Sequence, residues 1–199
     1  HALACAKDPL VDYRHGPMEF CEVASMAMEL LGGRYINEFY NDADTKRSNR
    51  EHLEGIIHIL AWAANIDAFQ HWLYEHPDHS PVERRQAWIG FYEQFGGKFM
   101  DWSDLTEVKA YLWHRQLHIF EIPFYYIEYG IAQLGALQVW LNARKDPKKA
   151  LADYRKGLAL GGSRPLPELY QAAGIRFDFS EGIIKPLADA VYQEWKKLS

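Results

Sequence analysis

The sequence DTKRSNREHLEGIIHILAWAANIDAFQHWLY at residues 44–74 predicts one long helix. Its apolar residues recur at helical spacing, and Pro77 follows shortly afterwards as a stop signal. The predicted apolar face consists of Leu53, Ile56, Ile57, Leu60, Ala64, Trp72 and Leu73. A face this broad is typical of a helix that is buried along one side.

Helical patterns continue before and after this segment. Most of them stop at glycine or proline, and the pattern that follows Ser80-Pro81 has Glu83 at the capping-box position. The predicted helices cover residues 2–6, 20–31, 81–95, 103–114, 124–142, 147–160, 165–173 and 180–197. Pro186 is expected to kink the last of these helices or to mark its true start.

One short segment departs from the helical pattern. Residues 175–179 alternate between apolar and polar side chains, which predicts a short strand whose partner is not evident. No run of alternating strands accompanies it, so the sequence predicts an all-α, or mainly α, fold. A chain of 199 residues has room for one compact domain, and we expect residues 1–199 to form a single helical domain.

Composition excludes several classes of protein. The 22 basic and 27 acidic residues give a net charge of −5, which argues against nucleic acid as a partner. The most membrane-like stretch, residues 129–143, is shorter than the ~20 residues of a spanning helix, so no membrane association is expected. Two cysteines do not make a disulfide scaffold, and together with the lack of a signal peptide they favour a cytoplasmic location.

The segment at residues 20–31 combines apolar residues with acids. Glu22, Ser25, Met26 and Glu29 are spaced so that they share one helix face. Acids amid so much apolar surface must be paired, hydrogen-bonded or metal-bound. Spacing alone favours a simpler interpretation, namely the solvated face of an amphipathic helix.

No Glu-x-x-His pair occurs, which argues against a di-iron helical bundle, and no phosphate-binding or CxxC motif is present.

Four blocks of this sequence, in order, resemble the oligoendopeptidase F family, whose relatives include thimet oligopeptidase. The likeness extends over essentially the whole chain. The blocks are DYRHGPMEFCEVASM at residues 12–26, DAFQHW at 67–72, HIFEIPFYYIEY at 118–129, and a last block of LGGS at 160–163 with LPEL at 166–169 and AAG at 172–174.

The resemblance implies the C-terminal half of a zincin-like helical peptidase domain, acting as a zinc metalloendopeptidase. Members carry H-E-x-x-H, in which two histidines bind zinc and the glutamate is the general base. Glu22 matches the family's third ligand in its Glu-x-x-Ser setting, and His1 matches the second histidine of the motif. The first histidine and the base are not in this sequence, so we expect these 199 residues to be inactive without the missing N-terminal part of the same enzyme. The alternative is a non-catalytic helical peptide-binding module or a truncated paralogue.

A second group of residues is formed by His118 and the tyrosines that follow it. Tyr125 and Tyr129, or Tyr126 and Tyr129, have the spacing of neighbours on one helix face, while Pro123 is expected to leave His118 in a turn or loop. Without the family resemblance, these tyrosines are better explained as packing aromatics. With it, His118, Tyr129 and Tyr126 are expected to bind the oxyanion or the substrate.

The resemblance also implies a channel that admits short peptides and excludes folded proteins. Among the three tyrosines, Tyr125 has the least defined position relative to the site, and it is assigned to substrate binding. Gly161 and Gly162 are expected to form a flexible loop near the bound peptide. An ordinary helix C-terminus is the alternative explanation for these two glycines.

Overall fold

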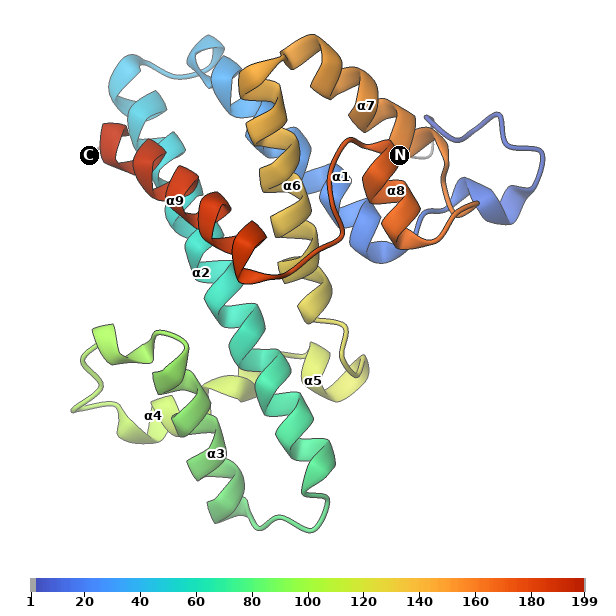
Figure 1. Cartoon of the computed structure of the whole chain (residues 1–199). Helices are drawn as coiled ribbons and strands as arrows, with labels where there is room; N and C mark the ends of the chain where they lie inside the picture. Colours follow the sequence, from blue (N-terminus) through green and yellow to red (C-terminus); the bar gives the residue numbers. More distant parts are fainter. Residues whose placement is uncertain (1–2, 199) are drawn as a thin grey trace. The chain divides into compact units, whose positions relative to one another are not determined.

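The computed structural model describes residues 3–198, and within that range it contains helices and no strands. The all-α prediction is therefore confirmed. The α-helices are α1 (Met18–Gly32), α2 (Asp42–Glu75), α3 (Pro81–Gln94), α4 (Thr106–Ala110), α5 (His118–Glu121), α6 (Ile127–Lys145), α7 (Pro147–Ala159), α8 (Leu166–Ala172) and α9 (Glu181–Leu198) (Figure 1). Four 3₁₀ helices join them: η1 (Val11–Arg14), η2 (Gly33–Glu38), η3 (Gly97–Phe99) and η4 (Leu112–Arg115).

The chain divides into two compact units. Unit 1 comprises residues 1–57 and 131–199, and unit 2 comprises residues 58–130. The divisions fall within α2 and within α6, so each of these helices contributes residues to both units. No helix among residues 3–198 is both long enough and apolar enough to cross a membrane.

Unit 1 is built around the apolar face of α1. The buried residues of this helix are Phe20, Val23, Ala24, Ala27 and Leu30, as the helical spacing predicted. Figure 1 shows α7 and α8, which pack against each other, beside α1.

Two contacts hold α1 against its neighbours in unit 1. The buried hydroxyl of Tyr154 on α7 donates a 2.8 Å hydrogen bond to the carbonyl of Ala24, and burial raises the pKa of Tyr154 to about 12. At Gly135 on α6, an added Cβ would lie 2.8 Å from Cγ2 of Val23 and 3.0 Å from the hydroxyl of Tyr170. Glycine therefore allows α6 to approach α1 and α8 closely.

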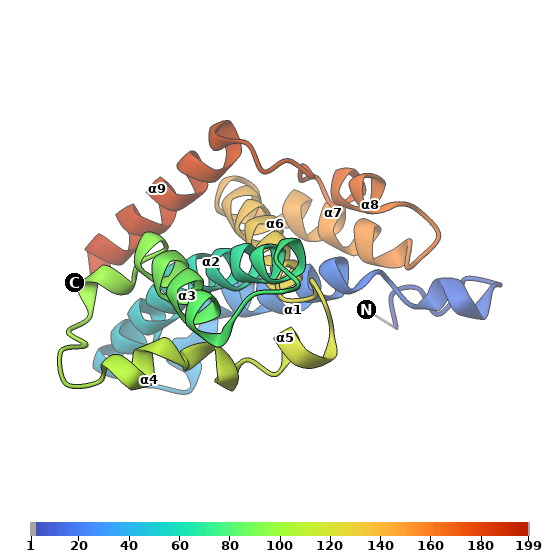
Figure 2. The same ribbon diagram turned by 90° about the horizontal axis from the view of Figure 1, so that it is seen from below.

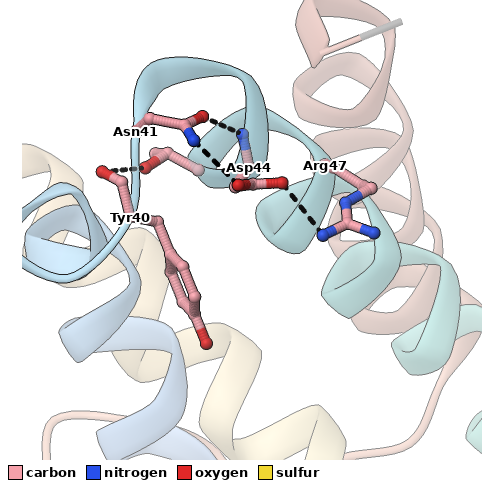
Figure 3. A network of polar contacts seen from close by, with 5 residues as sticks. Tyr40, Asn41, Asp44 and Arg47 are labelled. Atoms are coloured by element: carbon pink, nitrogen blue, oxygen red, sulfur yellow. Dashed lines mark hydrogen bonds and ion pairs between the residues drawn. The ribbon is translucent and has the colours of Figure 1, made fainter.

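The N-terminus of α2 is capped by side chains (Figure 3). The Asn41 carbonyl Oδ1 accepts a hydrogen bond from the backbone N–H of Asp44, and Asn41 Nδ2 donates to the Asp44 carboxylate, both at 2.9 Å. Asp44 also forms a 3.0 Å ion pair with Arg47, one turn further on. These bonds satisfy N–H groups that the first turn of a helix leaves without partners, and they place acids where the helix dipole favours them.

Unit 2 has an aromatic core. Its buried residues are Ala63, Ile66, Phe69, Trp88, Tyr92, Trp113, Ile119 and Tyr126. The indole of Trp88 donates a 2.9 Å hydrogen bond to the carbonyl of Lys109, which ties α3 to α4, two helices that lie in contact (Figure 2). Helix α3 begins with the predicted capping box, because Ser80 and Glu83 each accept a hydrogen bond from the other's backbone N–H.

The predicted strand at residues 175–179 is wrong: the segment has no regular secondary structure, and side chains of α6 bind backbone groups in and next to it. Gln138 on α6 accepts a hydrogen bond from Arg176 N at 2.9 Å and donates one to Arg176 O at 3.0 Å. Asn142 donates another to the Gly174 carbonyl at 2.9 Å. Two amide side chains of a helix therefore provide the hydrogen bonds that a neighbouring strand would otherwise supply.

Three helix predictions also need correction. The described part of residues 2–6 forms turns, and the first helical turn of the described chain is the 3₁₀ helix η1 further along. The helix expected over residues 103–114 is broken at Tyr111 into α4 and η4, whose Trp113 is buried in the core of unit 2. The last helix begins at Glu181 and has Pro186 in its interior, so this proline does not mark its start.

Candidate active site

Glu22 lies in the second turn of α1, on the side away from the buried face. Its Oε2 accepts a 3.0 Å hydrogen bond from the hydroxyl of Ser25, which also lies 3.2 Å from the Glu22 carbonyl. The Glu-x-x-Ser spacing places the two side chains one turn apart, so a helix of ordinary geometry produces this contact. Ser25 is exposed and Glu22 is partly exposed. The result is an oriented carboxylate that solvent reaches.

The other acid of this face has a separate partner. Glu29 lies 3.4 Å from Nε2 of His52 on α2. Residues 3–198 contain no group of three His, Cys, Asp or Glu side chains that could hold a metal ion. His1, the predicted second zinc ligand, lies outside the described residues. Glu22 is therefore the one predicted metal ligand whose surroundings the structure describes.

His118 is the centre of an aromatic cluster in unit 2. Its ring stacks on Tyr125 with centroids 5.5 Å apart, and it meets Tyr126 and Tyr129 edge to face at 5.1 and 5.8 Å. The Tyr129 hydroxyl lies 3.5 Å from Nε2 of His118. The structure thus brings together all four residues that sequence analysis selected from this segment. Whether they bind a substrate stays a prediction.

The local backbone differs from the predicted one. His118 begins the short helix α5 and does not lie in a loop, and α6 begins at Ile127 instead of Phe124. Phe124 adopts a left-handed φ of 60°, which is uncommon for a residue with a bulky side chain and incompatible with a right-handed helix. Tyr125 and Tyr126 therefore precede α6, and only Tyr129 belongs to its first turn. The tyrosines meet His118 from a turn and a helix start, not from one continuous helix face.

Two residues that sequence analysis did not select complete this cluster. Gln116 Nε2 lies 2.7 Å from His118 Nδ1, and Gln116 Oε1 accepts a 3.0 Å hydrogen bond from the indole N–H of Trp62. Trp62 is 54 residues earlier in the chain, on α2. Nothing in the local pattern around either residue indicates this contact, because only the folded arrangement of unit 2 brings them together.

Tyr126 is the most buried tyrosine of the cluster. Burial raises its pKa above the ordinary value, and the neighbouring Tyr129 adds to the rise. The nearby Trp62 side chain and the positive charge of Arg115 act in the opposite direction on this pKa. The Tyr126 phenol therefore remains protonated at neutral pH and is able to donate a hydrogen bond.

Gly161 and Gly162 follow α7 and pack closely on the segment around η1. Gly162 N donates a 2.9 Å hydrogen bond to the Tyr13 carbonyl. A Cβ added at Gly161, which has a φ of +52°, would lie 1.9 Å from that carbonyl oxygen, and a Cβ at Gly162 would lie 2.5 Å from the His15 carbonyl oxygen. Both glycines thus have a structural reason to be present, and their expected contact with peptide stays a prediction.

Unit 1 also contains a pocket. It has a volume of about 460 Å³ and is lined by residues that include Leu53, Trp140, Arg144 and Glu194. Glu22 does not line it.

Three solved structures resemble this helical chain over almost its whole length. A crystal structure assigned as an oligoendopeptidase F is 30% identical, with a TM-score of 0.89 over 98% of this chain and 34% of that chain. PZ peptidase A with inhibitor 2 is 28% identical, with a TM-score of 0.90 over 98% of this chain and 35% of that one. A protein assigned as an oligoendopeptidase F from Bacillus anthracis str. Ames is 29% identical, with a TM-score of 0.78 over 98% of this chain and 32% of that chain.

The family model for peptidase family M3 matches residues 1–189. The chain therefore belongs to peptidase family M3. It spans about a third of the length of the solved structures that it matches. None of the curated proteins compared with the chain matches it.

Proposed function

We propose that this chain is part of the catalytic domain of a zinc-dependent oligoendopeptidase that hydrolyses internal bonds of short peptides. The observation that carries the proposal is the match to peptidase family M3 over residues 1–189. The sequence contains no H-E-x-x-H motif. The first zinc histidine and the general base would therefore come from residues beyond these 199.

Glu22 has the chemistry of a zinc ligand. Zinc accepts carboxylate oxygens, and ligating side chains are generally oriented by a further hydrogen bond. Ser25 supplies that hydrogen bond to Oε2, and among the described residues Oε1 has no hydrogen-bond partner. Glu22 would hold the metal together with His1 and with a histidine from outside the chain.

The mechanism assigns a distinct role to each group of this chain. Zinc, when bound, would polarise the scissile carbonyl and lower the pKa of a water molecule. Ser25 keeps the Glu22 carboxylate in one orientation. In this proposal His118 and Tyr129 donate hydrogen bonds to the oxygen on which negative charge develops, and Tyr126 does the same or binds the substrate.

Substrate binding would use the aromatic faces of unit 2 and the loop after α7. Tyr125 stacks on His118 and is only partly buried, so its ring is accessible to a peptide side chain. The closely packed Gly161-Gly162 loop would present backbone groups to an extended peptide. Short, unfolded peptides suit such contacts because their backbone N–H and C=O groups are not paired internally.

This proposal is tested by comparing the peptidase activity of the isolated chain with that of a longer polypeptide that has H-E-x-x directly before His1. We expect the 199-residue chain to show no turnover of a quenched fluorescent peptide, even with added zinc, because it lacks the base and one ligand. The longer polypeptide should hydrolyse the peptide, lose activity after chelation and regain it with zinc. Turnover by the isolated chain, or peptide binding without hydrolysis by the longer polypeptide, would contradict the proposal.

A further inference from the structure

A chain of hydrogen bonds in unit 2 leads from the indole of Trp62 through Gln116 to the imidazole of His118. Trp62 Nε1 lies 3.0 Å from Gln116 Oε1, and Gln116 Nε2 lies 2.7 Å from His118 Nδ1. All three residues are at least partly buried. The direction of these hydrogen bonds is set by chemistry, because an indole nitrogen only donates.

The indole N–H determines which way the Gln116 amide points. If the amide were turned over, its NH₂ group would face the indole N–H, and two donors would be opposed at 3.0 Å. The amide oxygen therefore faces Trp62, and the NH₂ group faces His118. An NH₂ group at 2.7 Å requires an acceptor, so Nδ1 of His118 carries no proton.

We propose that Trp62 and Gln116 are positioning residues that hold the neutral His118 ring in the tautomer with its proton on Nε2. This inference rests on the proposed function, in which His118 donates a hydrogen bond to the developing oxyanion. Nε2 is the nitrogen that faces the Tyr129 hydroxyl, at 3.5 Å. Only the Nε2–H tautomer makes this nitrogen a donor.

The same arrangement sets the direction of the Tyr129 hydroxyl. When Nε2–H points toward the Tyr129 oxygen, that oxygen acts as an acceptor and its own proton must point elsewhere. Because 3.5 Å is long for a hydrogen bond, the Nε2–H is held only weakly by Tyr129, and an oxyanion that approaches both groups is able to accept from Nε2–H and from the phenol O–H. A pair of donors is what an oxyanion requires, whereas the opposite tautomer would present a lone pair of Nε2 to it.

Nitrogen NMR of the 199-residue chain with ¹⁵N-labelled histidine tests the tautomer directly. The spectra are recorded at a pH where the ring is neutral, and the His118 signals are assigned by their loss in His118→Gln. We expect Nδ1 to resonate as an unprotonated ring nitrogen and Nε2 as a protonated one. The tautomer is measured on the unsubstituted chain. A protonated Nδ1, or an equal mixture of tautomers, would overturn the inference.

Gln116→Glu is the sharpest variant because it keeps the side-chain shape and removes the donor. A carboxylate accepts from Trp62 and also from Nδ1–H, so the His118 tautomer should invert. Gln86→Glu, at an exposed position of α3, is the matched control and should leave the tautomer unchanged. Trp62→Phe removes the hydrogen bond that orients Gln116 and should give a mixture of tautomers.

Activity separates this inference from the proposed function. In the longer, catalytically complete polypeptide, Gln116→Glu should lower kcat about 10²-fold with little change in KM, because one oxyanion donor is lost. If the tautomer inverts and kcat stays the same, the assignment of His118 to the oxyanion is wrong and the positioning role stands. If the tautomer does not invert, the positioning role is wrong.

Discussion

Replacing Tyr129 by phenylalanine is expected to lower kcat about 10²-fold or more in the catalytically complete enzyme, which corresponds to ~2.7 kcal/mol of barrier. The substitution removes one hydroxyl and almost no volume. The 3.5 Å separation from His118 Nε2 is long for a hydrogen bond, so the free energy of unfolding should change by no more than ~0.5 kcal/mol. KM should change much less than kcat, because a donor to the oxyanion acts more strongly in the transition state.

Tyr125→Phe is the control for this experiment. Tyr125 contacts His118 through its ring, and phenylalanine keeps that stacking surface. Steady-state kinetics on both variants should show the large loss in Tyr129→Phe alone. Equal losses in the two variants, or a Tyr129→Phe enzyme with the kcat of the unsubstituted one, would show that Tyr129 is a packing residue.

Gly161→Ala is expected to lower the free energy of unfolding by about 3 kcal/mol or more. One part is the left-handed backbone, with φ at +52°, which disfavours a side chain by ~1 kcal/mol or more. A larger part is the new Cβ, which would lie 1.9 Å from the Tyr13 carbonyl oxygen. Backbone atoms cannot move aside as a flexible side chain does, so the loop and the segment around η1 must separate.

Thermal unfolding followed by circular dichroism measures this loss, and a chain of this size should unfold roughly 6–12 °C lower. Gly55→Ala provides the control, because Gly55 lies inside α2 and an added Cβ there meets nothing within 4 Å. That change should stabilise the chain by up to ~1 kcal/mol. If Gly161→Ala unfolds at the temperature of the unsubstituted chain, the loop does not pack as described.

Local sequence patterns predicted the helices well wherever the signal lay within one or two turns. The Ser80-Pro81 start with Glu83, the apolar face of α1 and the Asp146-Pro147 start of α7 all have their cause in adjacent residues. The Glu22–Ser25 contact belongs to the same class, because i and i+3 positions meet in any helix.

Predictions failed where a distant residue decides the local structure. The segment at residues 175–179 forms backbone hydrogen bonds with the side chain of Gln138, which lies almost 40 residues earlier. The contacts of Gln116 with Trp62 and His118 likewise include a partner far away in the sequence. Such contacts leave no periodic trace in the sequence, so pattern analysis could not have found them.

The start of α6 shows a third kind of failure. Helical spacing continues back to Phe124, yet the left-handed backbone at that residue delays the helix to Ile127. The rings of His71 and Tyr74, both on α2, lie 4.9 and 5.1 Å from the Phe124 ring. Tertiary packing of this aromatic side chain accompanies the strained backbone, and helix propensity alone does not predict it.

Zinc content is the measurement that tests the central claim most directly, namely that this chain supplies a zinc ligand through Glu22. The longer polypeptide with H-E-x-x before His1 is purified as the unsubstituted form, as Glu22→Gln and as Glu29→Gln, and its bound zinc is determined by atomic emission. Glu29 lies two turns further along the same helix face and has His52 as its partner, so it is a matched control. We expect about one zinc per chain in the unsubstituted form and in Glu29→Gln, and a loss of zinc affinity of at least 10²-fold in Glu22→Gln. Full zinc occupancy with unchanged affinity in Glu22→Gln would contradict the account.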